Sequence, residues 1–137
     1  MTTALVIGGE YYGRVPKNVP DGFSGSAWRA ACGQRRFLAT SLARLTKEHA
    51  ITKIIHGGDP GAGILAHGWA TKRDIAQEQV PLDRGLSKIE AMRRRNAAMI
   101  ERRPDLVIAF QGGRTTRDAI KRALAAGITV LDLRGCK

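Results

Sequence analysis

The residues best suited to chemistry in this sequence follow a short apolar run near its end. Leu106–Phe110 is continuously apolar, which is typical of a strand buried on both faces of a parallel sheet. Gly112 and Gly113 come next, and Thr115 or Thr116 can cap the helix that follows. Such a turn aims several backbone N–H groups and the positive end of a helix dipole at one spot, which favours a phosphate. Because a turn that needs glycine for its backbone angles alone has the same pattern, one turn does not decide between the two interpretations.

Two further glycine turns follow apolar runs, the first after Thr3–Ile7 and the second after Lys53–His56. Carboxyl ends of parallel strands share one edge of a sheet, so we expect the three turns to lie together. Three such turns on one edge favour a ligand that contains phosphate. The candidate ligand-binding residues, including two from a later helix, are Gly8, Gly9, Gly57, Gly58, Asp59, Gly61, Arg95, Asn96, Gly112, Gly113, Arg114, Thr115 and Thr116.

Apolar runs and helical periodicity alternate along the chain, which predicts an α/β fold with a three-layer, Rossmann-like parallel sheet of about five strands. Helices should cover both faces, and the expected strand order is 3-2-1-4-5, with the switch point between the first and fourth strands. The expected strands are Thr3–Ile7, Lys53–His56, Ile75–Leu82, Leu106–Phe110 and Ile128–Leu133. The expected helices cover residues 26–50, 64–74, 88–102 and 115–126, the first divided at Gly33 so that Gln34–Glu48 is its firm part.

The length of 137 residues suits one domain, 1–137. Residues 13–25 hold three glycines and two prolines, and we expect a loop insertion over about 13–33, of the kind that often serves as a lid or binding segment. We expect no membrane span and no export leader. Cys32 and Cys136 are too few for a metal site, so a cytoplasmic location is the default. The formal charge of +11 attracts nucleotides and polyanions without naming either as the ligand.

Several polar side chains have a specific expected role. Arg95 is a candidate clamp, because a guanidinium fork grips phosphate at two points. Asp59 can accept a bond from a ribose hydroxyl or organise its own turn. Arg114 and Arg117 oppose the dipole at a helix start, a conflict that a bound anion would relieve. Asn96 is expected to face inward toward the ligand or a loop carbonyl.

Other side chains could take part in catalysis or stacking. Glu10 is the carboxylate nearest the expected switch point and is the candidate general base if the protein hydrolyses its ligand, with Asp118 as the other candidate. Tyr11, Tyr12 and Trp28 are candidates for stacking on a base. The expected role of His56, at the end of a strand, is a structural hydrogen bond.

Four segments resemble the SLOG superfamily of Rossmann-like domains, and most closely its YspA/YpsA-related branch. They are His56–Gly63, the Arg-Asn-x-x-Met helix at Arg95–Met99, Pro104–Thr116 and Ala126–Val130. The resemblance covers most of the chain from Thr52 onward and the first strand. It implies a pocket for a nucleotide or nucleotide-derived ligand.

Two other SLOG branches carry related motifs. The lonely-guy phosphoribohydrolases, which cleave the base from nucleoside monophosphates, have a Pro-Gly-Gly-x-Gly-Thr-x-x-Glu motif that falls on Gln111–Ala119. Here Gln111 replaces proline, Thr115 replaces the third glycine and Ala119 replaces the catalytic glutamate. The DNA-processing protein DprA has a Gly-Ile-Asp-x-x-Ala-His stretch similar to Gly61–His67, where Gly63 replaces aspartate.

Three functions follow as hypotheses. The first is binding, with sensing or processing, of a nucleotide or nucleotide-sugar phosphate at the carboxyl edge of the sheet. The second is N-glycosidic cleavage of nucleoside monophosphates, and the third is binding of single-stranded nucleic acid, as the resemblance to DprA implies. A further resident cofactor or metal is not indicated, and a homo-oligomer is expected because small domains of this fold often complete their sites across an interface.

Overall fold

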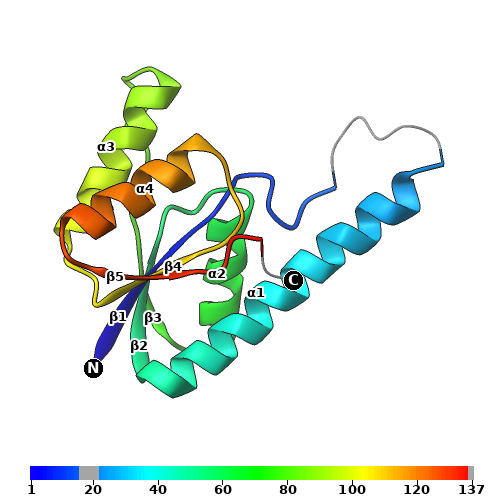
Figure 1. Cartoon of the computed structure of the whole chain (residues 1–137), viewed down its shortest axis with the longest axis horizontal. Helices are drawn as coiled ribbons and strands as arrows, with labels where there is room; N and C mark the ends of the chain where they lie inside the picture. The colour runs from blue at the N-terminus through cyan, green and yellow to red at the C-terminus, as the bar shows by residue number, and fades with distance from the viewer. Residues whose placement is uncertain (16–21, 136–137) are drawn as a thin grey trace.

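The computed structural model describes residues 1–15 and 22–135 of the chain. Five strands and four helices alternate along these residues (Figure 1). The strands are β1 (Thr2–Ile7), β2 (Ile51–His56), β3 (Ala76–Gln79), β4 (Leu106–Ala109) and β5 (Thr129–Asp132). The helices are α1 (Ser24–His49), α2 (Ala62–Lys72), α3 (Lys88–Glu101) and α4 (Arg114–Ala125).

All strand pairs are parallel, and the order in the sheet is β3-β2-β1-β4-β5. The predicted α/β fold and strand order are therefore confirmed. The winding direction reverses between β1 and β4, so the carboxyl ends of these two strands open on the switch point.

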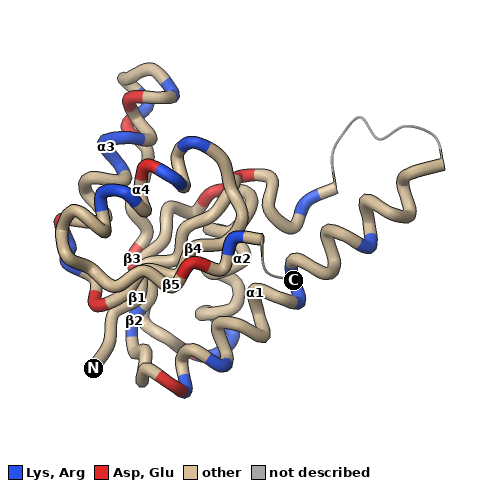
Figure 2. Tube along the Cα trace, viewed as in Figure 1, with Lys and Arg blue, Asp and Glu red and all other residues tan. Residues whose placement is uncertain are grey.

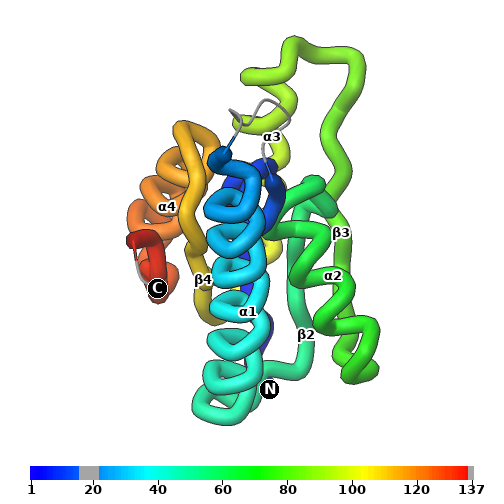
Figure 3. The backbone as a smooth tube through the Cα atoms, turned by 90° about the vertical axis from the view of Figure 1, so that its right-hand side faces the viewer, coloured from blue at the N-terminus to red at the C-terminus, as the bar shows by residue number. Residues whose placement is uncertain are grey.

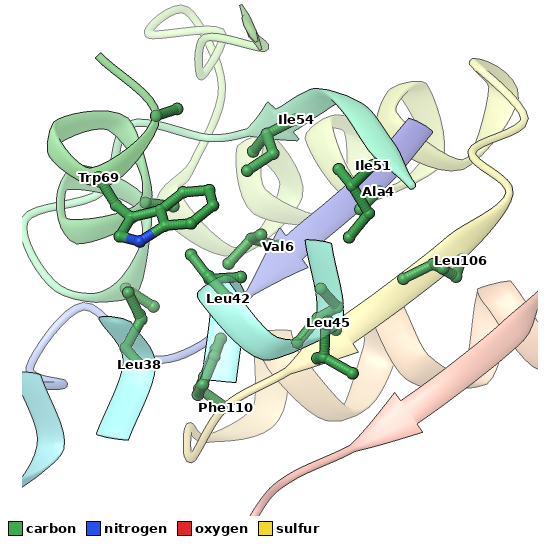
Figure 4. Close-up of a cluster of buried hydrophobic side chains, with 14 of the residues drawn as sticks. Ala4, Val6, Leu38, Leu42, Leu45, Ile51, Ile54, Trp69, Leu106 and Phe110 are labelled. Atoms are coloured by element: carbon green, nitrogen blue, oxygen red, sulfur yellow. The ribbon is translucent and has the colours of Figure 1, made fainter. Parts of the chain in front are cut away.

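Each face of the sheet buries its own apolar cluster. Leu38 and Leu42 of α1 and Trp69 of α2 pack on Val6 and Ile54 of the strands, as Figure 4 shows. The alternate strand residues face the other way and pack against α3 and α4, with Met99 and Ala123 among the contacts. Because side chains along a strand alternate between faces, buried strands with apolar residues at every position demand helices on both sides.

The long helix α1 lies next to α2 across one face of the sheet (Figure 3). It extends beyond the sheet at its Ser24 end, where Trp28 is exposed (Figure 1). Residues 24–33 belong to this helix, so this part of the expected loop insertion is helical and Gly33 does not divide the helix. One glycine in a helix interior costs only about 1 kcal/mol, and no proline follows to end the helix. Residues 16–21 of the expected insertion lie outside the described residues.

The remaining elements differ from prediction mainly at their ends. The third strand is shorter than Ile75–Leu82, because β3 is an edge strand that pairs only with β2. Among the helices of residues 1–15 and 22–135, none combines the length and apolar character that a membrane-spanning segment needs.

Candidate functional site

The three glycine turns lie against one another at the carboxyl edge of the sheet. The N–H of Gly9 donates to the carbonyl of Gln111 at 3.0 Å, and the carbonyl of Gly9 accepts the N–H of Ala62 at 3.2 Å. The turn after β1 is therefore joined by its backbone to the turns after β2 and β4.

Two of the glycines are required by this close approach. A Cβ atom at Gly61 would overlap the carbonyl oxygen of Gly9. A Cβ atom at Gly112 would overlap the Thr116 hydroxyl and lie 2.7 Å from the Gly9 nitrogen. Backbone packing thus accounts for both glycines without reference to a ligand.

A cleft of about 650 Å³ opens above the three turns, within the usual size of a small-molecule site. A second cavity of only about 20 Å³ lies under the cleft, and Gly8, Asp59 and Thr115 line both. The cleft is also lined by Gly9, Glu10, Tyr11, Tyr12, Gln34, Lys88, Met92, Gln111, Gly112, Gly113 and Arg114. The small cavity is also lined by Val6, Ile7, Gly57, Gly63, Arg95, Asn96, Met99, Thr116 and Ala119.

The start of α4 presents unused donors to the cleft and to the small cavity beneath it. Its N-cap is Gly113, which has no side chain to cap the helix, and its first turn contains no acidic residue. Among the described residues, the amides of Arg114 and Thr115 find no hydrogen-bond acceptor. Thr116 is 2% exposed, and its hydroxyl also has no partner there. Donors without acceptors at a helix start form a favourable site for an anion.

Arg95 has a different partner from the one expected. It is buried, and its two terminal nitrogens donate to the two carboxylate oxygens of Asp59 at 2.7 and 2.9 Å. The guanidinium lies directly over Gly57, where a Cβ would come within 2.7 Å of it. Its fork is thus engaged, so in this structure Arg95 positions the Asp59 carboxylate rather than facing the cleft as a phosphate clamp.

Asn96 and Asp118 connect α3 to α4. The side-chain amide of Asn96 donates to the carbonyl of Thr115 at 2.9 Å and to the Asp118 carboxylate at 3.1 Å. Arg122 also donates to Asp118, at 2.8 Å. Although burial alone would raise the pKa of Asp118, the bonds from Arg122 and Asn96 lower it overall. Asp118 lines neither the cleft nor the small cavity, and its carboxylate is bonded to both Asn96 and Arg122.

Glu10 does face the cleft, where it pairs with Lys88 of α3. The Lys88 nitrogen lies 3.1 Å from the Glu10 carboxylate, and this carboxylate raises the pKa of Lys88. Lys88 was not among the predicted residues. Topology could have indicated it, since α3 starts at the same sheet edge and Lys88 directly follows the N-cap Ser87.

The three candidate stacking residues occupy different environments. Tyr12 is 6% exposed and packs on Phe110 at 5.5 Å, and burial raises its pKa to about 12. Trp28 projects from the far part of α1 and lines neither the cleft nor the cavity below it. Tyr11 alone of the three is both exposed and at the cleft, with Arg14 over its ring at 5.6 Å.

His56 holds the turn after β2 from below, the structural role expected of it. Its Nδ1 accepts the N–H of Gly58 at 3.0 Å, and its Nε2 lies 2.9 Å from the side-chain oxygen of Gln77. The first bond requires an unprotonated Nδ1, so the ring is neutral. Burial lowers the pKa of His56, which keeps the ring in this form.

Within residues 1–15 and 22–135, no three side chains of the metal-ligating types gather closely enough to hold an ion. Cys136 lies outside these residues.

Comparison with known proteins bears on residues 23–86, which match the model of the YspA, cpYpsA-related SLOG family, YAcAr. The predicted resemblance to this SLOG branch is thereby confirmed for residues 23–86. The SLOG match contains the turn after β2 and all of α1, including residues 23–33, which the predicted resemblance left out. The turn after β4 lies beyond the matched residues. No curated protein and no solved structure matches the chain.

Proposed function

We propose that this SLOG protein binds a nucleotide or nucleotide-derived phosphate ligand in the cleft at the carboxyl edge of its sheet. SLOG membership suggests a nucleotide-related ligand without specifying which one. The observation that carries the proposal is the start of α4, where backbone amides and the buried Thr116 hydroxyl have no acceptor among the described residues. A phosphate in the cleft would satisfy the amides of Arg114 and Thr115, which line it, and the Thr116 hydroxyl lines the small cavity beneath.

The Asp59 carboxylate supplies the second anchor. It lines both the cleft and the cavity beneath, and Arg95 fixes both of its oxygens. A carboxylate held in this way can still accept hydrogen bonds from a pair of ribose hydroxyls, since each oxygen has more than one lone pair. Phosphate on α4 and ribose near Asp59 would orient a nucleotide across the edge of the sheet.

Binding has more support in this geometry than hydrolysis has. The residue at the position of the lonely-guy catalytic glutamate is Ala119, and Asp118 is engaged with Asn96 and Arg122. Glu10 remains the one carboxylate from the predicted pair that faces the cleft, and it is bound to Lys88. We therefore favour a protein that senses its ligand over one that hydrolyses it. We further propose that it does so in the cytoplasm and as a homo-oligomer.

Isothermal titration calorimetry with nucleoside monophosphates, ADP-ribose and cyclic nucleotides tests the proposal. We expect at least one to bind, and Thr116→Val to weaken that binding. Absence of heat with all of them would contradict the proposal. Release of free base during incubation with nucleoside monophosphates would instead favour the hydrolytic alternative.

Single-stranded nucleic acid is a second candidate ligand, because α3 and α4 carry exposed arginines and one of them, Arg114, lines the cleft. Lys and Arg residues are distributed over both α3 and α4 (Figure 2). Arg93 and Arg94 of α3 are exposed, as are Arg114 and Arg117 of α4. Binding of this kind weakens linearly in a log–log plot against salt, with a slope that counts the phosphates contacted. If single-stranded DNA shifts in a gel at low salt but its binding lacks this salt dependence, the exposed arginines do not bind its phosphate backbone.

A further inference from the structure

A second, apolar pocket borders the cleft on its α1 side. We call it the α1 groove, and its volume is about 470 Å³. Ala30, Gly33 and Phe37 of α1 form one wall, and Leu133, just after β5, lies opposite. Among the described residues that line it, none carries a charge. A phosphate would therefore find no cationic partner in this groove, whereas its apolar walls suit a neutral ring.

The groove is continuous with the cleft rather than separate from it. Tyr12, Gln34 and Gln111 line both spaces and form the boundary between them. The charged side chains of the two spaces, among them Glu10, Lys88 and Arg114, all lie on the cleft side of that boundary. The two spaces therefore divide one continuous site into a charged part and an apolar part.

Two carboxamides at the boundary are held in fixed orientations. The side-chain oxygen of Gln34 accepts the N–H of Gly13 at 2.7 Å, and that of Gln111 accepts the N–H of Gly135 at 3.0 Å. Since both oxygens are engaged, each side chain has its NH₂ group left to donate, and neither NH₂ has a protein acceptor among the described residues. Fixed donors beside an aromatic wall suit a flat heterocycle with ring nitrogens or carbonyl oxygens on its edge.

We propose that the α1 groove is the nucleobase subsite, so that the ligand crosses the Gln34–Gln111 boundary from its phosphate on α4 to its base on α1. This inference rests on the proposed function. It differs from stacking of the base on Tyr11, which is 70% exposed on the cleft side and already covered by Arg14. Tyr12 contributes to the groove wall with its buried ring.

Gly33 offers a way to block the groove without disturbing the cleft. It lines the groove but not the cleft, and a Cβ at this position meets no atom within 4 Å. Gly33→Leu and the larger Gly33→Phe should therefore fold, since replacing a helix-interior glycine favours the helix. Gly68 of α2 has equally open surroundings and lines neither space, so Gly68→Leu and Gly68→Phe are matched controls.

The test compares ribose 5-phosphate with the four common ribonucleoside monophosphates by calorimetry. For the unmodified protein, we expect at least one monophosphate to bind about tenfold more tightly than ribose 5-phosphate, a usual size for one stacked base. Gly33→Leu should reduce this advantage and Gly33→Phe should abolish it, with ribose 5-phosphate unchanged. The Gly68 variants and Tyr11→Ala should retain it.

Two patterns would overturn the inference, and they are distinguishable. If ribose 5-phosphate binds but the monophosphates gain nothing, or keep their advantage in both Gly33 variants, the base lies elsewhere and only the subsite is wrong. If only Tyr11→Ala loses the tighter binding of the monophosphate, the base lies on the cleft side of the Gln34–Gln111 boundary. If none of the five compounds binds, the proposed function fails and the subsite with it.

Discussion

The turn after β2 and the turn after β4 both carry paired glycines and both enter a helix whose N-cap is glycine. Their hydrogen bonds differ. After β2, Gly58 donates to His56, Ala62 donates to Gly9 and Ile64 donates to Asp59. After β4, the amides of Arg114 and Thr115 have no acceptor among the described residues.

This difference separates two uses of one sequence pattern. The β2 turn uses the amides of Gly58, Ala62 and Ile64 for its own contacts, and at the start of α2 only that of Gly63 has no acceptor among the described residues. The β4 turn keeps the amides of both Arg114 and Thr115 available for a ligand. Glycine turns at the edge of a sheet are therefore not equivalent anion sites, and the hydrogen-bond partners of each turn decide its role.

The two N-cap glycines provide the sharpest test of this contrast. Gly61 and Gly113 have similar backbone angles (φ −93° and −100°), but a Cβ at Gly61 overlaps backbone and a Cβ at Gly113 meets nothing within 4 Å. We expect Gly61→Ala to lose about 3 kcal/mol of stability, because backbone cannot move aside cheaply. Gly113→Ala should lose less than about 1 kcal/mol. Urea denaturation measures both, and equal losses would contradict the assignment.

Arg95 carries the next largest expected effect. Arg95→Met removes the partner of Asp59, whose side chain is only 18% exposed. The Asp59 carboxylate left without a partner should lower the free energy of unfolding by about 2 kcal/mol. This loss is smaller than for a fully buried pair, because some water reaches the carboxylate. In a double-mutant cycle with Asp59→Asn, the combined loss should be smaller than the sum of the single losses. Additive losses would mean that the two side chains do not depend on each other.

These positions also show how far the sequence could predict the site. Alternating apolar runs were enough for the strand order, and hence for the meeting of the three turns. The Arg95–Asp59 pair could not be predicted, because the two residues are 36 positions apart and a basic side chain on a helix has no pattern that names its partner. Tyr11 and Tyr12 were equivalent in the sequence, since a turn has no periodicity to separate an exposed neighbour from a buried one. Residues 26–33 were expected both in a divided first helix and in a loop insertion, because Gly33 and the glycines and prolines before it weaken the helical pattern.

The pH dependence of stability tests the β2 turn through His56. Burial lowers the pKa of His56 from its ordinary 6.5, so below about that pH the unfolded chain takes up a proton that the folded chain resists. The contribution of neutral His56 to the free energy of unfolding is complete above pH 6.5. As the pH falls below this value, the contribution is lost at up to about 1.4 kcal/mol per pH unit. Denaturation between pH 7.5 and 5 should show this slope reduced in His56→Gln. An unchanged slope in that variant would mean that other groups produce it.

The smallest expected change in stability concerns the β4 turn. Thr116→Val removes a buried hydroxyl that has no partner in the described residues, so stability should stay constant or rise by up to about 1 kcal/mol. Binding of ribose 5-phosphate should weaken in the same variant. Thr46 in α1 also has a buried hydroxyl without a partner, and Thr46→Val is the matched control that should leave binding intact. A loss of stability without a loss of affinity would assign Thr116 to the structural class of the β2 turn.

The backbone of Gly9 links the turns on either side of it in the sheet. Its nitrogen bonds to Gln111 and its oxygen to Ala62, so a single residue spans both neighbouring loops. Neither loop can open without releasing either the N–H or the carbonyl of Gly9, and the whole rim should therefore open and close as one cooperative unit. Inserting or deleting a single residue between Ile7 and Tyr12 would break both attachments at once, which makes this the stretch of the rim least able to change its length.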